Sequence, residues 1–294
     1  MITVSNLTKT FGTQTVVSNV SFTLEPNTAT ALIGPNGAGK TTTLSMLTGL
    51  LAPTSGSIEI AGVKDIRREI GFLPQYPQFY PWLTALEFTE MAAKLSGVPG
   101  PAAKKEAERV LAFVGLEEAM KKKTATFSGG MKQRLGMAQA IVHKPKLLLL
   151  DEPVSALDPV GRREIMNLLK ELQQQTTILY STHILNDAEE MTDQLLFLRK
   201  GELVESGSLT EVRAKFEAPR YRIEFVTQED ALQFTSQSQL SATAAGSTVY
   251  VEIVEERPKM QQLLERLAAS KFAVTKVERV TASLEEIFMK VAGQ

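Results

Sequence analysis

The chain has 294 residues, a formal net charge of -1 at pH 7, 43% hydrophobic residues and 22% charged residues. These values are typical of a globular protein with one large or two unequal domains. Because there is no cysteine, a disulfide framework, a Cys-ligated metal site and a thiol nucleophile are excluded, and the cytoplasm is the expected compartment. The near-neutral charge balance is not typical of nucleic-acid binders, so we expect no nucleic-acid partner.

The N-terminus and the apolar runs indicate neither an export signal nor a membrane span. Residues 1–6 alternate like a strand and lack the basic region and apolar stretch of a signal peptide. The longest purely apolar runs are short, such as Leu147 to Leu150, whereas crossing a bilayer takes roughly 18 to 20 residues. We therefore expect a chain that does not itself span a membrane.

The first third of the chain has the pattern of short strands interrupted by one helix. A glycine-rich loop follows the third strand and leads into helical character at 42–50. The expected strands are 2–7, 16–24, 29–33, 57–60 and 69–73.

Residues 84 to about 143 then lose strand character. Within this segment Ala107, Val110, Leu111 and Val114 recur at the spacing i, i+3, i+4, i+7, which predicts one apolar stripe of an amphipathic helix. We interpret the segment as a helical lobe inserted into an α/β core.

Core character returns in two apolar runs at 146–151 and 176–180, with a helix predicted between them at 159–173. Continuous apolar strands separated by helices indicate a parallel sheet covered on both faces. Two further runs, 195–199 and 203–205, are joined at Lys200-Gly201 and predict a hairpin, after which a charged helix closes this part of the chain.

Beyond about residue 218 the pattern changes to that of a small α+β domain, residues 219–294. Alternating strands are predicted around Ile223 and Val251, and a third at 272–280. Pro258 is expected to open one helix, and Ser283 with Glu286 forms a capping box for the last helix. The segment 236–247, rich in Ser, Thr, Ala and Gly, is predicted to be a loop.

A phosphate-binding loop is indicated by residues 34–41, Gly-Pro-Asn-Gly-Ala-Gly-Lys-Thr, which fit G-x-x-x-x-G-K-[ST] between a predicted strand and a predicted helix. Glycines let backbone N–H groups turn toward phosphate oxygens, and the helix N-terminus adds positive potential. In this pattern Lys40 bridges the β- and γ-phosphates and Thr41 places its hydroxyl on Mg²⁺. We refer to residues 34–41 as the P-loop.

The second half of such a site is a carboxylate at a strand end, and Asp151 and Glu152 supply it after four leucines. Two adjacent carboxylates beside a polyphosphate repel each other in a purely structural role. They become favourable when Mg²⁺ and a water molecule to be activated are present. Asp151 is therefore the candidate metal ligand, and Glu152 is the carboxylate that directly follows it in the sequence.

Taken with these two motifs, residues 127–134, Phe-Ser-Gly-Gly-Met-Lys-Gln-Arg, make the chain resemble the nucleotide-binding subunit of an ABC transporter. The family signature is L-S-G-G-Q; Phe127 and Met131 depart from it, while the Ser-Gly-Gly core is intact. The resemblance implies that Ser128, Gly129 and Gly130 meet the γ-phosphate bound by a second copy. A helix cap followed by a turn is the alternative for these three residues.

Four further positions match family motifs in order, and the resemblance implies their roles. Phe11 stacks on adenine, with a strand-end core residue as the alternative. Gln75 is the glutamine that senses magnesium and the attacking water. Asp158, in Ser-Ala-Leu-Asp at 155–158, belongs to a loop that crosses the dimer interface, and His183 contacts the γ-phosphate.

The resemblance covers nearly all of residues 1 to about 215. It implies two subunits closing head to tail on two Mg-ATP, with Glu152 polarising a water molecule for in-line attack. The resulting fold class is a P-loop ABC cassette, residues 1–218, with a β-rich N-terminal part, a parallel-sheet core and a helical lobe, followed by the small α+β domain. The implied nucleotide-binding, metal and catalytic residues are Gly34, Asn36, Gly37, Gly39, Lys40, Thr41, Thr42, Gln75, Asp151, Glu152 and His183, with Phe11, Ser128, Gly129, Gly130 and Asp158.

ABC-type ATPases fall into several classes that act with different partners. The short separation of Lys40 and Ser128 leaves no room for the coiled-coil arms of DNA-repair and chromosome-organising ATPases. A transporter subunit requires an integral membrane permease, which would place this chain on the cytoplasmic face of the membrane. The aromatic run 75–82 suggests where a permease docks, although aromatic residues are also ordinary core residues.

The segment 151–163 and the ending Ser-Leu-Glu-Glu-Ile-Phe at 283–288 resemble the ATPases of ABC-2 type exporters. The alternatives are an importer ATPase with a C-terminal regulatory domain and a soluble ABC-type regulatory ATPase. A neighbouring gene for a protein of about six membrane spans would favour the exporter, and one for a solute-binding protein would favour import.

Overall fold

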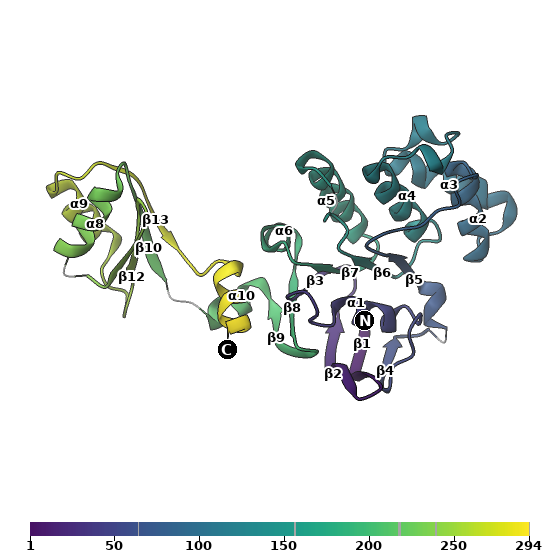
Figure 1. The fold of residues 1–294 in the computed structure, drawn as a ribbon, viewed down its shortest axis with the longest axis horizontal. Coiled ribbons are helices and arrows are strands. Elements are labelled where there is room, and N and C mark those ends of the chain that lie inside the picture. Colours follow the sequence, from purple (N-terminus) through teal and green to yellow (C-terminus); the bar gives the residue numbers. More distant parts are fainter. Residues whose placement is uncertain (64, 156, 217–218, 239, 294) are drawn as a thin grey trace. The chain divides into compact units, whose positions relative to one another are not determined.

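The computed structural model describes residues 1–63, 65–155, 157–216, 219–238 and 240–293 (Figure 1). The chain forms two compact units, Met1–Leu209 with Val291–Gln294, and Thr210–Lys290. The domain boundary predicted after residue 218 borders residues 217–218, which lie outside the described residues, and it stays a prediction.

The first unit is built on a six-stranded sheet in the order β5-β6-β7-β3-β8-β9. Neighbouring strands from β5 to β8 are parallel, and β9 is antiparallel to β8. The leucines of β6 are all fully buried, as expected for a strand covered on both faces. The predicted parallel sheet is thus confirmed. The strands are β3 (Ala29–Ile33), β5 (Ile70–Leu73), β6 (Leu147–Asp151), β7 (Thr177–Thr182), β8 (Gln194–Arg199) and β9 (Glu202–Ser208).

Different layers cover the two faces of this sheet (Figure 1). On one side lie α1 (Lys40–Leu47) and an antiparallel sheet ordered β2-β1-β4; on the other lie α5 (Pro159–Gln173) and α6 (Leu185–Met191). Apolar side chains of α1, β1 and the central sheet join in one buried cluster, which fixes the start of α1 against the end of β3. The N-terminal strands are β1 (Ile2–Phe11), β2 (Gln14–Leu24) and β4 (Ser55–Ile60).

Three helices occupy the segment predicted to be helical, α2 (Ala85–Leu95), α3 (Gly100–Phe113) and α4 (Gly129–Ile141). The apolar stripe predicted from Ala107 to Val114 is completely buried, because α3 packs against both α2 and α4. Short 3-10 turns lie at Ile66–Glu69, Glu117–Ala119 and Thr124–Thr126. None of the helices in the described part of the chain is long and apolar enough to cross a membrane.

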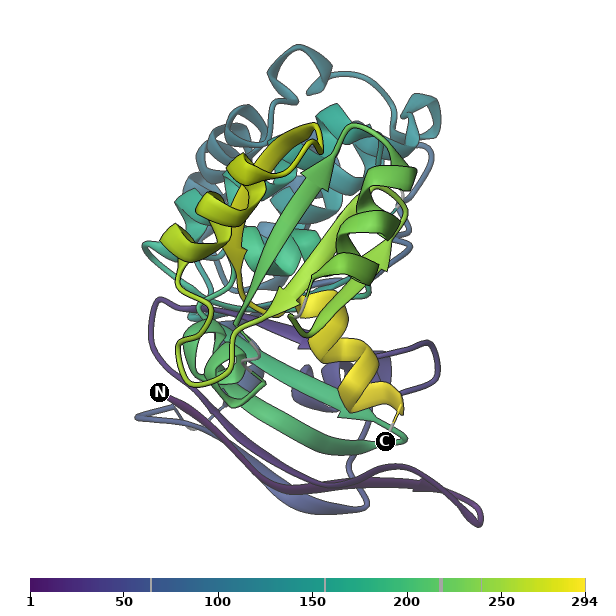
Figure 2. The ribbon, with the colours of Figure 1, turned by 90° about the vertical axis from the view of Figure 1, so that its left-hand side faces the viewer.

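The second unit contains a four-stranded antiparallel sheet in the order β11-β12-β10-β13. The chain order strand-helix-strand-strand-helix-strand with this strand order is the ferredoxin-like topology. Helices α8 and α9 lie on the same face of the sheet (Figures 1 and 2), over a core that includes Phe225, Phe234 and Phe272. The elements after β9 are α7 (Leu209–Lys215), β10 (Arg220–Phe225), α8 (Gln228–Gln237), β11 (Ala242–Ala245), β12 (Thr248–Glu252), α9 (Met260–Ala269), β13 (Val274–Val280) and α10 (Leu284–Gly293). The first residue of α7 and the residues of α10 from Val291 onward belong to the first unit.

One prediction in this unit is wrong. The segment 236–247 is not simply a loop, because Ala242–Ala245 forms β11 and pairs with β12. Alanine has low strand propensity, and its small side chain gives little alternation in hydrophobicity, so the sequence pattern missed the strand. Residue 239 lies outside the described residues. Helix α8, which the sequence analysis also missed, is capped by the Thr227 hydroxyl.

Candidate active site

The P-loop connects β3, which ends at Ile33, to α1, which begins at Lys40. Gly37 and Gly39 have φ of 79° and 101°, values that residues with a side chain rarely adopt. Gly39 is the N-cap of α1 and no side chain caps this helix end. The first backbone N–H groups of the helix are therefore free of a side-chain acceptor, as an anion site requires.

A cavity of about 200 Å³ lies above the P-loop, and we call it the phosphate pocket. Val16 of β2 borders it at one side. Eight of the residues predicted from the sequence line it together: Asn36, Gly37, Gly39, Lys40, Thr41, Thr42, Gln75 and Glu152. The structure thus gathers in one place residues from three separate parts of the sequence.

Lys40 is only 7% exposed, and its Nζ donates to the carbonyls of Gly34 at 2.7 Å and Pro35 at 3.2 Å. Burial lowers the pKa of the Lys40 ammonium group, and the charges of Glu152 and Asp151 act in the opposite direction. A polyphosphate entering the pocket would add negative charge beside this ammonium, which favours its protonated form.

One hydroxyl on the neighbouring strand binds both the Asp151 carboxylate and the backbone of Glu152. Asp151 lies opposite Ser181 in the β6–β7 register, and Ser181 Oγ donates to Asp151 Oδ1 at 2.6 Å. Ser181 Oγ also accepts a hydrogen bond from the backbone N–H of Glu152, at 2.9 Å. Ser181 is fully buried and therefore fixes both acidic residues. Sequence reasoning missed this role, although Ser181 stands two residues before His183.

Glu152 occupies a sharp turn directly after β6. Its φ is 50°, an unfavourable value for a glutamate that persists only where the surroundings hold it. The carboxylate is 9% exposed, and its Oε2 lies 2.6 Å from Nδ1 of His183, which is itself 52% exposed. A carboxylate that lines the phosphate pocket is thus paired with an accessible imidazole.

The donor atoms at the site suit a magnesium ion that is shared with a nucleotide. Thr41, Gln75 and Asp151 offer hydroxyl, amide and carboxylate oxygens, the kinds of ligand that Mg²⁺ prefers. Among the described residues there is no cluster of three or more His, Asp or Glu side chains that could hold a metal alone. Phosphate oxygens and water molecules would therefore have to complete the coordination shell.

The signature residues do not line the phosphate pocket of their own chain. Ser128 is exposed and is the N-cap of α4, where its Oγ accepts from the Met131 N–H at 3.3 Å. Gly129 and Gly130 form the first turn of this helix. The cap predicted as the alternative is therefore present, and it leaves the remaining N–H groups of this helix end at the surface.

Five other predicted residues are also missing from the pocket lining. Two of them, Asp151 and His183, contact Ser181 and the Glu152 carboxylate as described above. Gly34 begins the P-loop, and a Cβ atom there would come within 2.3 Å of the Leu198 carbonyl oxygen. Asp158 caps α5 by accepting from the Gly161 N–H at 2.8 Å; its neighbour Ala156 lies outside the described residues. Phe11 ends β1 and is 49% exposed, so the alternative of a core phenylalanine is wrong.

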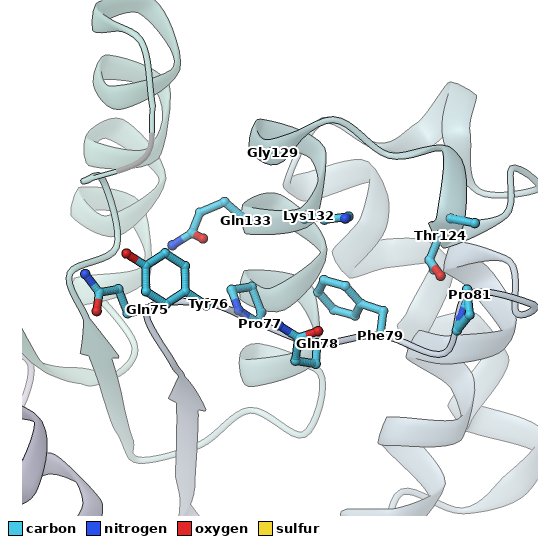
Figure 3. Close-up of a pocket in the computed structure, with 11 residues that line it drawn as sticks. Gln75, Tyr76, Pro77, Gln78, Phe79, Pro81, Thr124, Gly129, Lys132 and Gln133 are labelled. Carbon is cyan, nitrogen blue, oxygen red and sulfur yellow. The ribbon is translucent and has the colours of Figure 1, made fainter.

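The aromatic run after Gln75 lines a second cavity of about 300 Å³ (Figure 3). Figure 3 shows Tyr76 and Pro77 beside helix α4, which carries Lys132 and Gln133. Gln133 is buried, and its Nε2 donates to the carbonyl of Pro153 at 2.8 Å. This bond joins the signature helix to the residue after Glu152, a link that sequence reasoning did not find.

Two family matches cover most of the chain. Residues 17–155 match the ABC transporter family, and residues 207–292 match the C-terminal domain of ATP-binding proteins like DrrA1-3. An uncharacterized ABC transporter ATP-binding protein of Bacillus subtilis, YxlF, is 42% identical over 99% of both chains. The bacitracin transport ATP-binding protein BcrA of Bacillus licheniformis is 42% identical over 70% of this chain and 69% of its own length. The linearmycin resistance ATP-binding protein LnrL of Bacillus subtilis is 38% identical over 72% and 70%.

Solved structures agree with these matches. An ATP-binding subunit of an ABC transporter superposes with a TM-score of 0.68 at 32% identity and covers 74% of this chain and 93% of its own. The dimeric ATP-binding cassette MJ0796, in a post-hydrolysis state with ADP and Pi, has a TM-score of 0.65 at 30% identity and covers 71% and 99%. This chain therefore belongs to the family of ABC transporter ATP-binding proteins, which are ATPases.

Proposed function

We propose that the chain is the ATP-hydrolysing subunit of an ABC-2 type exporter and works as a pair of identical copies on a separate membrane permease. The observation that carries this proposal is the placement of Glu152. It combines a strained backbone, a buried carboxylate and a contact to His183 at the edge of the pocket that Lys40 and Thr41 also line. Strain and buried charge of this kind cluster at catalytic sites.

The roles at the phosphate pocket follow from donor chemistry. The N–H groups at the start of α1 and the Lys40 ammonium bind the β- and γ-phosphates. Thr41, Asp151 and Gln75 would hold Mg²⁺, which neutralises charge developing on the phosphates. Gly37 and Gly39 let the loop approach the phosphate oxygens, while Asn36 and Thr42 border the same pocket. Phe11, which is exposed at the end of β1, would offer its ring to adenine.

Glu152 is the residue that activates water. Its carboxylate accepts a hydrogen bond from the nucleophilic water and orients it toward the γ-phosphate. His183 Nδ1 lies 2.6 Å from Glu152 Oε2, and Nε2 on the other side of the imidazole ring can contact the terminal phosphate. This contact would link the carboxylate to the presence of that phosphate.

Two copies are needed because one chain leaves its signature helix away from its own P-loop. The start of α4, at Ser128, Gly129 and Gly130, is the proposed second anion site, because Ser128 and Gly129 are exposed and the N-terminus of a helix favours negative charge. In a head-to-tail pair, this helix end of one copy completes the phosphate pocket of the other, and Asp158 lies in the loop that crosses the interface. The MJ0796 cassette, similar over 71% of this chain, was solved as a dimer.

The permease is proposed to dock on the aromatic segment Gln75–Trp82 and the adjoining groove. Tyr76, Tyr80 and Trp82 are 69%, 50% and 64% exposed, an unusual density of aromatic surface for a free protein. The groove, of about 760 Å³, is lined mainly by apolar side chains, and its described lining residues include Arg67 and His143 but no carboxylate. An apolar helix of the permease, docked on the cytoplasmic face of the membrane, fits this surface.

Export is favoured over import by the relatives. Similar proteins are named for bacitracin transport and linearmycin resistance, and the second unit matches a domain described for DrrA1-3-like proteins. The test is to purify the chain with a neighbouring membrane protein and to measure ATP hydrolysis with candidate compounds. Stimulation by an exported peptide or lipid-like compound supports export, whereas dependence on a solute-binding protein would refute it.

The decisive variant for the ATPase site is Glu152→Gln, which keeps the shape of the side chain and removes its basicity. We expect hydrolysis to fall by about three orders of magnitude or more while Mg-ATP still binds. In sedimentation this variant should form a dimer with Mg-ATP, and the double variant Glu152→Gln with Ser128→Arg should bind ATP as a monomer. Near-normal turnover of Glu152→Gln would remove this residue from its role.

A further inference from the structure

The turn between β8 and β9 lies directly against the P-loop. Lys200 and Gly201 form a two-residue hairpin turn with φ of 49° and 84°, between the paired residues Arg199 and Glu202. The Gly201 N–H donates to the carbonyl of Ala38 in the P-loop at 3.0 Å, and the Gly201 carbonyl accepts from the Ser18 N–H at 2.8 Å. The turn therefore ties the P-loop to β2 by two backbone hydrogen bonds.

Glycine is required at this contact because the backbones approach closely. A Cβ atom at Gly201 would lie 2.3 Å from the Val16 carbonyl oxygen, and one at Gly39 would lie 2.9 Å from the same oxygen. At Gly34 the obstacle is the Leu198 carbonyl oxygen, also at 2.3 Å. The backbones of the P-loop, of residues 16–18 and of residues 198–201 are thus in close contact. We call residues 16–18 and 198–201 the P-loop seat.

The bond from Gly201 sets the direction of a phosphate-binding group. A trans peptide places its C=O and N–H on opposite sides, so holding the Ala38 carbonyl against Gly201 directs the Gly39 N–H away from the turn. Ala38 and Gly39 both line the phosphate pocket. The seat therefore preorients a backbone donor before any anion arrives, and such preorganised donors carry much of the binding and catalytic energy of an anion site.

Arg199, the residue before this turn, also binds helix α10. Arg199 Nη1 donates to the carbonyl oxygen of Val291 at 3.0 Å. Val291 belongs to the same unit as the P-loop and lies in the last turn of α10, where carbonyl groups lack helical partners and attract cations. Arg199 thus links this part of the hairpin to Val291 by one hydrogen bond.

We propose that the P-loop seat is a positioning element for the nucleotide site, with Gly201 as its positioning residue, and that Arg199 makes it responsive to the C-terminal residues from Val291 onward. The inference rests on the proposed binding of Mg-ATP at the P-loop. A change at the seat is expected to act on nucleotide affinity without any contact between Arg199 or Gly201 and the nucleotide, because neither lines the phosphate pocket.

The first test compares Gly201→Ala with Gly62→Ala in the full chain. Both glycines have positive φ, but no atom lies within 4 Å of a Cβ at Gly62, so this variant controls for backbone strain alone. We expect Gly201→Ala to weaken Mg-ATP binding about tenfold or more, the effect of losing one hydrogen bond to a charged group, and Gly62→Ala to leave it within about twofold. Equal affinities of the two folded variants would overturn the proposal.

A second test avoids any backbone clash. Arg199→Gln, and separately deletion of residues 291–294, should each weaken Mg-ATP binding about two- to fivefold, and Arg199→Lys should restore part of the loss. If both act through one bond, the combined variant is no weaker than the single ones. Additive effects, or a lower unfolding temperature with unchanged affinity, would reduce Arg199 to a structural role and contradict the proposal.

These tests separate the inference from the proposed function. Wild-type chain must bind Mg-ATP and Lys40→Ala must lose that binding; failure of either result overturns the proposed ATP site itself. When both results hold and the seat variants bind like wild type, the ATP site stands and only the seat is refuted.

Discussion

The two units of the chain differ in what they bury. All of the buried polar and charged side chains among the described residues lie in the first unit, and the charged ones, Lys40, Asp151 and Glu152, all lie at the P-loop or at the end of β6. In the second unit the buried residues are apolar, and charged residues such as Arg222 and Glu278 form pairs on the half-buried face of the sheet.

This difference shows where the chemistry is. A buried charge costs free energy unless it has partners, so a protein retains a cluster of them where a ligand compensates for the cost. An apolar core with paired surface charges requires no ligand. Catalysis is therefore expected in the first unit, and substitutions in the second unit should change stability while sparing the nucleotide site.

The largest effect is expected for Lys40→Ala. Removing the ammonium deletes the main positive charge of the phosphate pocket, and we expect hydrolysis to fall about a thousandfold or more, with Mg-ATP affinity reduced at least about a hundredfold. Titration with a fluorescent ATP analogue and a phosphate-release assay measure the two losses. A variant that still binds and hydrolyses ATP would show that the P-loop is not the site.

The second-largest effect is expected for Phe234→Ala, in the second unit. This ring is 6% exposed and packs against Phe225 and Phe272, so its removal should lower the free energy of unfolding of this unit by about 3 to 4 kcal/mol. Trp82 is the only tryptophan and lies in the first unit. Unfolding followed by Trp82 fluorescence should keep the wild-type denaturant midpoint, while circular dichroism should show an additional transition at lower denaturant. A loss of Mg-ATP affinity in this variant would contradict the separation of stability and catalysis between the two units.

A smaller effect is expected from Ser181→Ala. The substitution leaves Asp151 and the Glu152 N–H without their shared partner, at a cost of about 1 to 3 kcal/mol, and should slow hydrolysis about tenfold to a hundredfold. Thr89→Val is the matched control, because it also deletes a buried hydroxyl of the first unit, one that bonds only within α2. The rate of phosphate release at saturating ATP is measured for both variants. If both hydrolyse ATP equally slowly, Ser181 has no specific role.

The smallest effect is expected from Thr227→Ala, which removes the cap of α8. A lost N-cap costs about 1 kcal/mol, and Thr227→Ser should keep most of that stability. Hydrogen exchange of α8 amides measures the change. ATP hydrolysis by both variants should equal that of wild type, and a slower rate would link the second unit to catalysis.

Much of the first unit could be predicted from sequence because its signals are local. The leucine run of β6, the P-loop between β3 and α1, and the apolar stripe of α3 each depend on adjacent or regularly spaced residues. The predicted helix 159–173 matches α5 because Asp158 and Pro159 mark its start chemically. Family motifs then identified side chains such as Gln75, which the fold brings to the same pocket as Lys40.

What could not be predicted depends on contacts between distant segments. The roles of Ser181 and Gln133 follow from strand register and helix packing. The hydrogen bond from Gly201 to Ala38 joins residues that are far apart in the sequence of the first unit. In the second unit, β11 is held by pairing with β12 rather than by its own alanine-rich sequence. The shared site of two copies is likewise a property that one chain does not display.

The most direct test of that shared site mixes two inactive variants, Lys40→Ala and Ser128→Arg. In a head-to-tail pair made of one copy of each, one site receives Lys40 from one chain and Ser128 from the other, so it is intact, while the second site carries both defects. Random mixing should therefore restore about a quarter of the wild-type number of intact sites, with hydrolysis rising in proportion. Hydrolysis that stays at the level of the separate variants at every mixing ratio would contradict a site built from two chains.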